Sequence, residues 1–481
     1  ITSSTGRVIP DVLEQSGIEL ARERVKGLGV DDLSRQVWFI RSAMTALSME
    51  GAEDYRAPAR PTRREPKREA GRDRLIAAAR AVAERLRSIA LESADGEISW
   101  VGLGLVGDRH WTLATAGLDL YSGLPGIGLF FGYLASVTGD ERYMKTARAV
   151  AGTIVRQLRL AKWPADPPIG AFGPMAGSAY FLTHMGHLWG DEELLIVAED
   201  LLLRVPPAIG GDKYVDIISG VAGCIPVLLA QNRVRGCDGL VAAAVNCGDH
   251  LISHAAQANS GLGWKTVSNS SGPLTGFSHG AAGIAWALLE LYAVTLQDRF
   301  RDTALAGLEY ERGLFCVEES NWPDLRVFVD RPAPHADGPS FMTAWCHGAA
   351  GIGIARAKML THLRGSIHSS ELEEEVRAAV SATLAHGFGS NHCLCHGALG
   401  NIELLLLASQ ELGDTRLKLE TYRAAAAVLD NISETGWLCG VPAGVETPGL
   451  MTGLAGIGYE LLRLAEPDNL PSVLVLSSPT I

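Results

Sequence analysis

The feature of this sequence that most constrains its fold is a short glycine motif that recurs seven times. Each copy reads Gly-x-x-Gly and runs into a small or apolar, leucine-rich stretch, although Pro174 replaces the first glycine in the second copy. Successive second glycines are 51, 46, 60, 68, 49 and 56 residues apart, and each interval suits one pair of helices. These glycines are Gly126, Gly177, Gly223, Gly283, Gly351, Gly400 and Gly456.

The apolar patterns around the motif predict how the helices pack. Segments that follow the glycines, such as 126–135, 283–291 and 400–408, are apolar nearly all round, which is typical of helices buried on every side. Segments between them, such as 372–380, place apolar residues at helical spacing on one face only. The sequence therefore predicts an all-α protein, an α/α toroid with seven inner helices inside a ring of seven outer ones.

The glycines also predict where the functional residues lie. Two glycines three residues apart at a helix start allow a sharp turn and close approach of neighbouring backbones. If each copy begins an inner helix, the seven loops converge on one rim of the ring, and the positive ends of the helix dipoles point at that rim.

The residues just before the glycines differ between copies. The first, second, third and seventh copies carry Ser, Phe, Ser and Thr, whereas the fourth carries His279 and the next two carry Cys346-His347 and Cys395-His396. Two thiolates and one imidazole, from Cys346, Cys395 and His396, would hold a tetrahedral zinc ion with its fourth position open. Such an open position indicates a catalytic metal rather than a structural one.

The remaining cysteines have simpler interpretations. Cys393 lies outside the repeated motif, so we interpret it as a neighbour of the metal site, although it is able to compete as a ligand. Single cysteines in an apolar helical protein are usually small core residues, which is our interpretation of Cys224, Cys237, Cys247, Cys316 and Cys439.

The composition and the net charge exclude some partners and locations for this protein. The 481 residues carry 42 Lys and Arg against 54 Asp and Glu, a formal charge of −12, which disfavours nucleic acid as a partner. No apolar run is long enough to span a membrane, and the N-terminal stretch has no signal-peptide core. We therefore expect a cytoplasmic protein whose cysteines are reduced.

Three motifs resemble the lanthionine synthetase C-like (LanC-like) family. They are TAWCHGAAGIGIAR around Cys346, NHCLCHGALGN around Cys395 and GFSHGAAGIAW around His279, and the resemblance extends over about residues 75–470. Members of this family are zinc-dependent cyclases built as α/α toroids. The stretches ISWVGL from Ile98, GDRHW from Gly107 and FMTAWCHG from Phe341 are most similar to the C-terminal cyclase domain of class II (LanM-type) lanthipeptide synthetases.

The resemblance implies a domain organisation. LGVDDLSRQVWFIRSAM, within residues 1–50, resembles the end of the dehydratase domain that precedes the cyclase in those bifunctional enzymes. Residues 51–74 combine prolines with a basic run and are interpreted as a linker. Residues 75–481 are then the cyclase domain. The catalytic part of the dehydratase is missing, so we expect a C-terminal fragment of a longer enzyme.

The resemblance also implies a reaction. The substrate is a precursor peptide with a leader, whose Ser and Thr residues have been dehydrated, and a peptide Cys thiol adds to the resulting alkene to form a thioether ring. Zinc activates that thiol. The family roles assign His279 as the general acid and Asp216 as its orienting or proton-accepting partner. Alternatively, His279 is a rim histidine bonded to a carbonyl, and Asp216 is a helix N-cap.

The sequence departs from the stand-alone cyclases at two positions. Some of these enzymes have Arg and Tyr where this chain has Met342 and His347, so those roles do not transfer. His347 is either a proton shuttle or a packing residue. Two other functions remain open: a LanC-like enzyme that adds glutathione or another small thiol to dehydroamino acids, and a non-catalytic, zinc-containing scaffold that binds peptides.

Overall fold

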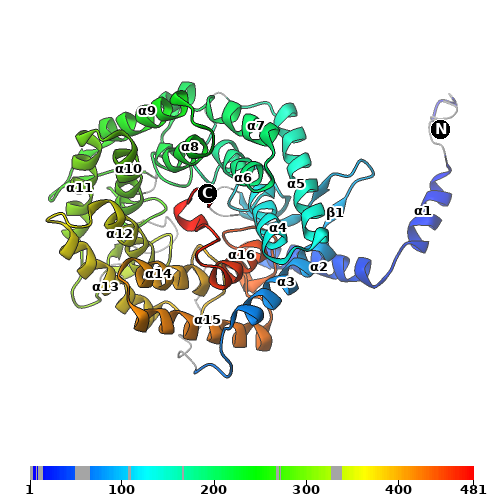
Figure 1. The fold of residues 1–481 in the computed structure, drawn as a ribbon. Helices are drawn as coiled ribbons and strands as arrows, with labels where there is room; N and C mark the ends of the chain where they lie inside the picture. Colours follow the sequence, from blue (N-terminus) through cyan, green and yellow to red (C-terminus); the bar gives the residue numbers. More distant parts are fainter. Residues whose placement is uncertain are drawn as a thin grey trace.

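The computed structural model describes most of the chain. The described residues are 4–6, 8, 15–48, 65–106, 110–164, 167–266, 270, 272–326 and 339–480. Within them, helices dominate and form two concentric rings (Figure 1). This confirms the predicted all-α toroid, to which the structure adds only small two-stranded sheets.

The inner ring consists of helices that are buried along nearly their whole length. Each packs against the next, and the last packs against the first, so the ring is closed. The inner helices are α4 (Leu124–Thr138), α6 (Pro174–Trp189), α8 (Val221–Arg235), α10 (Ala281–Thr295), α12 (Ala349–Leu363), α14 (Ala398–Glu411) and α16 (Leu454–Ala465).

The outer ring is amphipathic, as the helical spacing of its apolar residues predicts. In α5, for example, Tyr143, Ala147, Val150 and Ile154 are buried at intervals of three or four residues. The first outer helix, α3, packs on the last inner helix, α16, so the two ends of the ring are joined. The outer helices are α3 (Arg72–Ile89), α5 (Glu141–Leu160), α7 (Glu192–Leu202), α9 (Asp238–His254), α11 (Asp298–Arg312), α13 (Ser369–His386) and α15 (Thr415–Thr435).

Short glycine-aspartate turns connect several inner helices to their outer partners. Gly139 ends α4 in the left-handed conformation, and the Asp140 carboxylate then accepts the Arg142 N–H and caps α5. Gly190-Asp191 connects α6 to α7 with the same two conformations. These local signals reverse the chain in one or two residues, which keeps the two rings in contact.

Each inner helix begins at a glycine N-cap, in the second copy Gly173 rather than the position of Pro174. The second glycine of each motif faces the carbonyl oxygen six residues before it. A Cβ added at Gly400 would lie 1.8 Å from the Leu394 carbonyl oxygen, and the corresponding distances in the other copies are 1.8–3.0 Å. The motif therefore allows the loop to fold back onto the first turn of its helix.

Backbone hydrogen bonds join the loops of neighbouring repeats along the rim. The Cys346 N–H donates to the Cys395 carbonyl, the Cys395 N–H donates to that of Met451, and the Met451 N–H donates to that of Tyr121. One repeat earlier, the Ser278 N–H donates to the Cys346 carbonyl. This belt brings loops that are tens of residues apart in sequence to one rim, as the motif predicts.

Small hairpins lie between outer and inner helices. Their strands are β1 (Leu91–Glu92) with β2 (Ile98–Ser99), β3 (Val101–Val106) with β4 (His110–Thr115), β5 (Ala256–Gln257) with β6 (Leu262–Gly263), and β7 (Pro323–Asp324) with β8 (Ser340–Phe341). All four pairs are antiparallel. The 3₁₀ turns are η1 (Pro206–Gly211), η2 (Pro442–Gly444) and η3 (Val473–Val475).

The C-terminal segment fills the middle of the ring (Figure 1). Residues 473–476 are buried there, and the indole N–H of Trp345 donates to the Leu474 carbonyl at 3.0 Å. The Tyr180 and Tyr459 hydroxyls donate to the Ser477 and Pro471 carbonyls. The toroid is therefore a packed body, with the segment anchored by aromatic side chains of the inner ring.

Two helices lie outside the ring. Helix α1 (Gly17–Lys26) projects away from it, whereas α2 (Val30–Ser48) is tied to it by a hydrogen bond from the Trp38 indole to the Glu446 carbonyl (Figure 1). Of the predicted linker, residues 51–64 lie outside the described residues. The domain boundaries stay predictions. None of the described helices combines the length and apolar character that crossing a membrane requires.

Candidate metal centre

The structure brings the three predicted metal ligands together at the rim. One ligand atom from each of Cys346, Cys395 and His396 lies within 4.8 Å of the other two. Both cysteines are buried, and all three residues come from the loops that precede α12 and α14. Two sulfurs and one nitrogen are a donor set that zinc favours, and tetrahedral zinc needs its ligands only about 1 Å closer together. The residues therefore fit a metal ion.

The surroundings shift the pKa values of these three groups in different directions. A hydrogen bond from Cys395 lowers the pKa of the Cys346 thiol, against the effect of burial and with help from the charge of Arg326. The same bond, together with burial, raises the pKa of Cys395 well above its ordinary value. Burial lowers the pKa of His396, which keeps its imidazole neutral and able to donate a lone pair to a metal.

Asp216 and His279 form a second group on the same rim. Asp216 precedes α8, and its Oδ1 accepts the Ser219 and Gly220 N–H groups at 2.7 and 3.1 Å. Its Oδ2 lies 2.6 Å from His279 Nδ1. Asp216 is thus hydrogen-bonded to His279, whereas the alternative of a helix N-cap was wrong, because Gly220 is the N-cap of α8. The carboxylate holds Nδ1–H, so Nε2 remains for proton exchange.

His279 is predisposed to carry a proton. Burial opposes its protonation, but the charge and hydrogen bond of Asp216 outweigh that effect and raise its pKa above the ordinary value. Its side chain is 28% exposed, and its ring stacks on that of His347 with the centroids 5.8 Å apart. A partly exposed imidazole with a raised pKa is suited to general acid catalysis.

His347 and Met342 have surroundings that the sequence did not predict. Burial, and then the charge of Arg326, lowers the pKa of His347 to about 3. Its Nε2 finds no hydrogen-bond partner among the described residues. Met342 Sδ lies 2.9 Å from Nη2 of Arg326, a residue that follows β7. An arginine from another segment therefore occupies the neighbourhood of Met342.

Tyr121 also reaches the metal group, from the first repeat. Its hydroxyl is hydrogen-bonded to the Cys395 thiol, and burial raises its pKa well above the ordinary value. Tyr121 stands two residues before the N-cap Gly123, as Cys346 and Cys395 stand before theirs. This position, two residues before the N-cap glycine, is the sequence signal that points to Tyr121.

The other cysteines only partly match the expectation. Cys393 is buried, lies outside the metal group, and has its pKa raised to about 12 by burial. Cys224, Cys247 and Cys439 are core residues as predicted, but Cys237 and Cys316 are half-buried, so that prediction was wrong for them. Cys237 is the N-cap of outer helix α9, and Cys316 follows outer helix α11, which places both near the surface.

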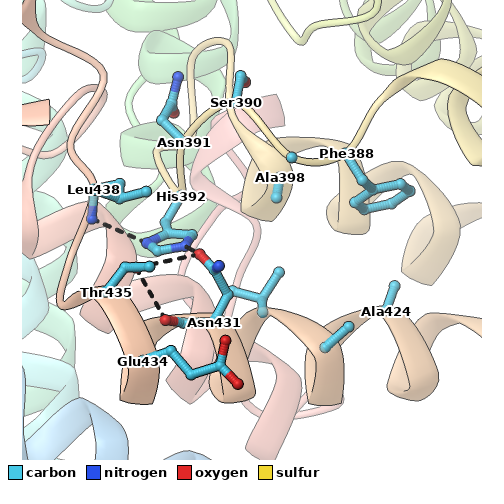
Figure 2. Close-up of a pocket in the computed structure, with 13 residues that line it drawn as sticks. Phe388, Ser390, Asn391, His392, Ala398, Ala424, Asn431, Glu434, Thr435 and Leu438 are labelled. Carbon is cyan, nitrogen blue, oxygen red and sulfur yellow. Dashed lines mark hydrogen bonds between the residues drawn. The ribbon is translucent and has the colours of Figure 1, made fainter. Parts of the chain in front are cut away.

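A cavity of about 290 Å³ adjoins the loop that carries Cys395 (Figure 2). His392 forms one wall, where its Nδ1 accepts the Leu438 N–H and its Nε2 donates to Asn431 Oδ1. Both ring nitrogens are thus engaged, and burial lowers the pKa of this histidine. The other walls are mainly apolar and include Phe388, Ala398, Ala424, Ala427 and Val428. The cavity therefore offers a contact surface rather than further metal ligands.

Comparison with known proteins identifies the family and agrees with the fold. The lanthionine synthetase C-like protein family matches residues 115–475. The chain is 24% identical over 465 residues to the lacticin 481/lactococcin biosynthesis protein LcnDR2 of Lactococcus lactis subsp. lactis. That match covers 93% of this chain and 46% of LcnDR2, so the chain spans about half the length of this relative.

A solved structure titled nisin cyclase has the same fold. It superimposes with a TM-score of 0.59 at 17% identity, covering 84% of this chain and 97% of the cyclase. Because the family match extends over most of the chain, this protein belongs to the lanthionine synthetase C-like family.

Proposed function

We propose that this protein is a zinc-dependent lanthipeptide cyclase. It would add peptide Cys thiolates to dehydroalanine and dehydrobutyrine, forming lanthionine and methyllanthionine rings. The observation that carries the proposal is the meeting of Cys346, Cys395 and His396 on one rim, beside the Asp216–His279 pair. Cys346, Cys395 and His396 would hold a zinc ion, which would lower the pKa of a peptide thiol bound to it and so supply a nucleophile at neutral pH.

Other residues of the site supply the proton and orient its donor. Addition of the thiolate to the β-carbon of the alkene moves the π electrons toward the neighbouring carbonyl and forms an enolate. His279, protonated and held by Asp216, donates a proton from Nε2 to the α-carbon and completes the thioether. Asp216 keeps the imidazole in the required orientation and stabilises its charge. The lowered pKa values of His396 and Cys346 favour the protonation states that a metal needs, whereas Cys395, whose pKa is raised, would release its proton when the metal binds.

The proposed substrate is a dehydrated precursor peptide with a leader. The name of the relative LcnDR2 refers to the biosynthesis of lacticin 481 and lactococcin, which supports a role in making a peptide product. The greater length of that relative supports a dehydratase region that precedes the cyclase in a longer enzyme. On this proposal, the cyclase takes the dehydrated peptide after the dehydratase has acted, in the cytoplasm.

The test is a thiol titration. The purified chain is mixed with zinc and a chemically dehydrated peptide that contains one Cys, and free thiols and peptide mass are followed together. Loss of the thiol at unchanged mass supports cyclisation, because the addition is intramolecular and releases nothing. A mass increase equal to glutathione, when glutathione is supplied, supports the small-thiol alternative instead. No thiol loss in either reaction, with full zinc occupancy, contradicts an enzymatic function.

A further inference from the structure

Arg326 contacts the loop that carries Cys346, although it belongs to no glycine motif. It follows β7 by two residues and reaches the loop that carries Cys346, where its Nη2 lies 2.9 Å from Met342 Sδ. That loop is short and closed, because Thr343 and Gly348 form an isolated bridge and the Ala344 N–H donates to the His347 carbonyl. A contact with Met342 therefore fixes Arg326 relative to Cys346.

The orientation of Arg326 is set by a carboxylate. Its Nε donates to Asp324 Oδ1 at 2.9 Å and its Nη2 donates to Oδ2 at 2.7 Å, in the two-pronged geometry that holds a guanidinium plane rigidly. The Asp324 side chain is 5% exposed and that of Arg326 is 27% exposed. A cation held this firmly, and mostly withdrawn from water, acts on its neighbours with little screening.

The chemistry of the proposed reaction needs a positive charge at this place. When the thiolate adds to the alkene, negative charge moves to the carbonyl oxygen of the dehydroamino acid. His279 supplies the proton to carbon, but the oxygen needs a separate partner until that transfer occurs. Rigid donors that face a developing oxyanion are among the largest contributors to catalysis.

We propose that the Arg326 guanidinium binds the carbonyl oxygen of the dehydroamino acid and stabilises the enolate formed there. This inference rests on the proposed cyclase function. In the step, the carbon–sulfur bond forms as the carbon–carbon π bond breaks, and the electron pair moves to the oxygen held by Arg326. The enolate then collapses as His279 Nε2 delivers a proton to the α-carbon. The thiol proton leaves on cysteine binding, so the overall reaction adds S–H across the alkene.

The test uses the whole chain, zinc and the one-Cys dehydrated peptide, with the rate of thiol loss measured in a single turnover. Arg326→Gln should slow the reaction about 100-fold while the zinc content stays at one per chain. Arg326→Lys should fall between this variant and the wild type. The matched control is Arg301→Gln, which removes an exposed arginine paired with Asp302 on outer helix α11 and should leave the rate unchanged.

Two further variants separate catalysis from structure. Arg326→Gln leaves Asp324 buried without its partner, so a structural defect should be relieved in the double variant Arg326→Gln/Asp324→Asn, whereas a catalytic loss should persist. Arg326→Ala should regain part of its rate when guanidinium is added at a low, non-denaturing concentration.

Three outcomes would overturn the inference: an Arg326→Gln rate within twofold of the wild type, restoration of the rate in the double variant, or loss of zinc from Arg326→Gln. Absence of thiol loss with the wild-type chain has a different meaning, because it contradicts the proposed function itself.

Discussion

At the scale of single residues, the site combines groups whose charges have been adjusted by their neighbours. A hydrogen bond from Cys395 lowers the pKa of the Cys346 thiol, and burial lowers the pKa of His396. Asp216 opposes the effect of burial on His279 and favours the charged imidazole. The same rim therefore combines a thiol with a lowered pKa, an imidazole with a lowered pKa and a second imidazole with a raised pKa.

Substituting either cysteine of the metal group should remove the metal. Cys346→Ala or Cys395→Ala leaves two protein ligands, so zinc should fall from one per chain to well below half after dialysis, and cyclisation should stop. Cys393→Ala is the matched control, since this buried thiol lies outside the group. Elemental analysis of the three variants checks the prediction, and full zinc in either Cys346→Ala or Cys395→Ala would remove the ligand assignment.

Replacing the carboxylate beside His279 should move the pH dependence of activity. Asp216 raises the pKa of His279, so the imidazolium persists above the ordinary value near 6.5. Asp216→Asn removes that charge, lowers the pKa, and should shift the alkaline limb of the pH–rate profile to lower pH. Asp212→Asn perturbs the same loop, where Asp212 accepts the Val221 N–H, and should leave that limb in place. An unmoved limb in Asp216→Asn would exclude His279 as the acid.

The metal group could be predicted from the sequence because its residues occupy fixed positions before repeated glycines, whereas the pairing of Asp216 with His279 was predicted from the resemblance to the LanC-like family. Arg326 could not, because it lies in a hairpin outside the repeats and reaches the site through Met342. Tyr121 escaped attention because a tyrosine in the cysteine register does not by itself indicate a ligand. Both are positioned by tertiary contacts that carry no local pattern.

At the scale of helices, glycines decide how closely loops and helices approach. The inner and outer rings could be predicted because local sequence determines whether a helix is apolar on all sides, as in the inner ring, or on one side only, as in the outer ring. The second repeat also has a glycine N-cap, Gly173, but it lies four residues before the second glycine instead of three. Pro174 is then the first helical residue. A proline is well suited there because the first turn requires no N–H from it.

Adding a methyl group at a motif glycine should disrupt its loop. In Gly400→Ala the new Cβ would meet the Leu394 carbonyl, which must move together with the adjoining Cys395 and His396. We expect the free energy of unfolding to fall by about 2–3 kcal/mol and zinc to bind more weakly. Gly152→Ala in α5 is the control, because nothing lies within 4 Å of its Cβ position. It should gain up to ~1 kcal/mol from helix propensity, and urea unfolding measures both.

At the scale of the whole molecule, the ring is closed at its circumference and filled at its centre. The belt of backbone hydrogen bonds sets the rim, and the C-terminal segment supports it from inside through Trp345, the neighbour of Cys346. The toroid could be predicted from the repeats, whereas this segment could not. Its apolar run is too short to indicate a helix, and its burial depends on a space that exists only once the ring has formed.

Removing the C-terminal segment should therefore weaken both the fold and the site. A chain that ends at Leu470 loses the buried side chains of residues 473–476, each of which contributes about 1.5–3 kcal/mol as an upper estimate. We expect a lower melting temperature and weaker zinc binding, because Trp345 loses the partner of its indole N–H. Calorimetry with and without zinc tests this, and an unchanged melting temperature would show that the ring is stable without its central segment.

The most direct test of the account is X-ray absorption spectroscopy at the zinc edge of the purified chain, before and after addition of a peptide that contains one cysteine. We predict one zinc ion with two sulfur ligands and one protein nitrogen, and a third sulfur at about 2.3 Å once the peptide is bound. A spectrum that shows a closed set of four protein ligands, unchanged by the peptide, would contradict an open metal position that receives the substrate thiol.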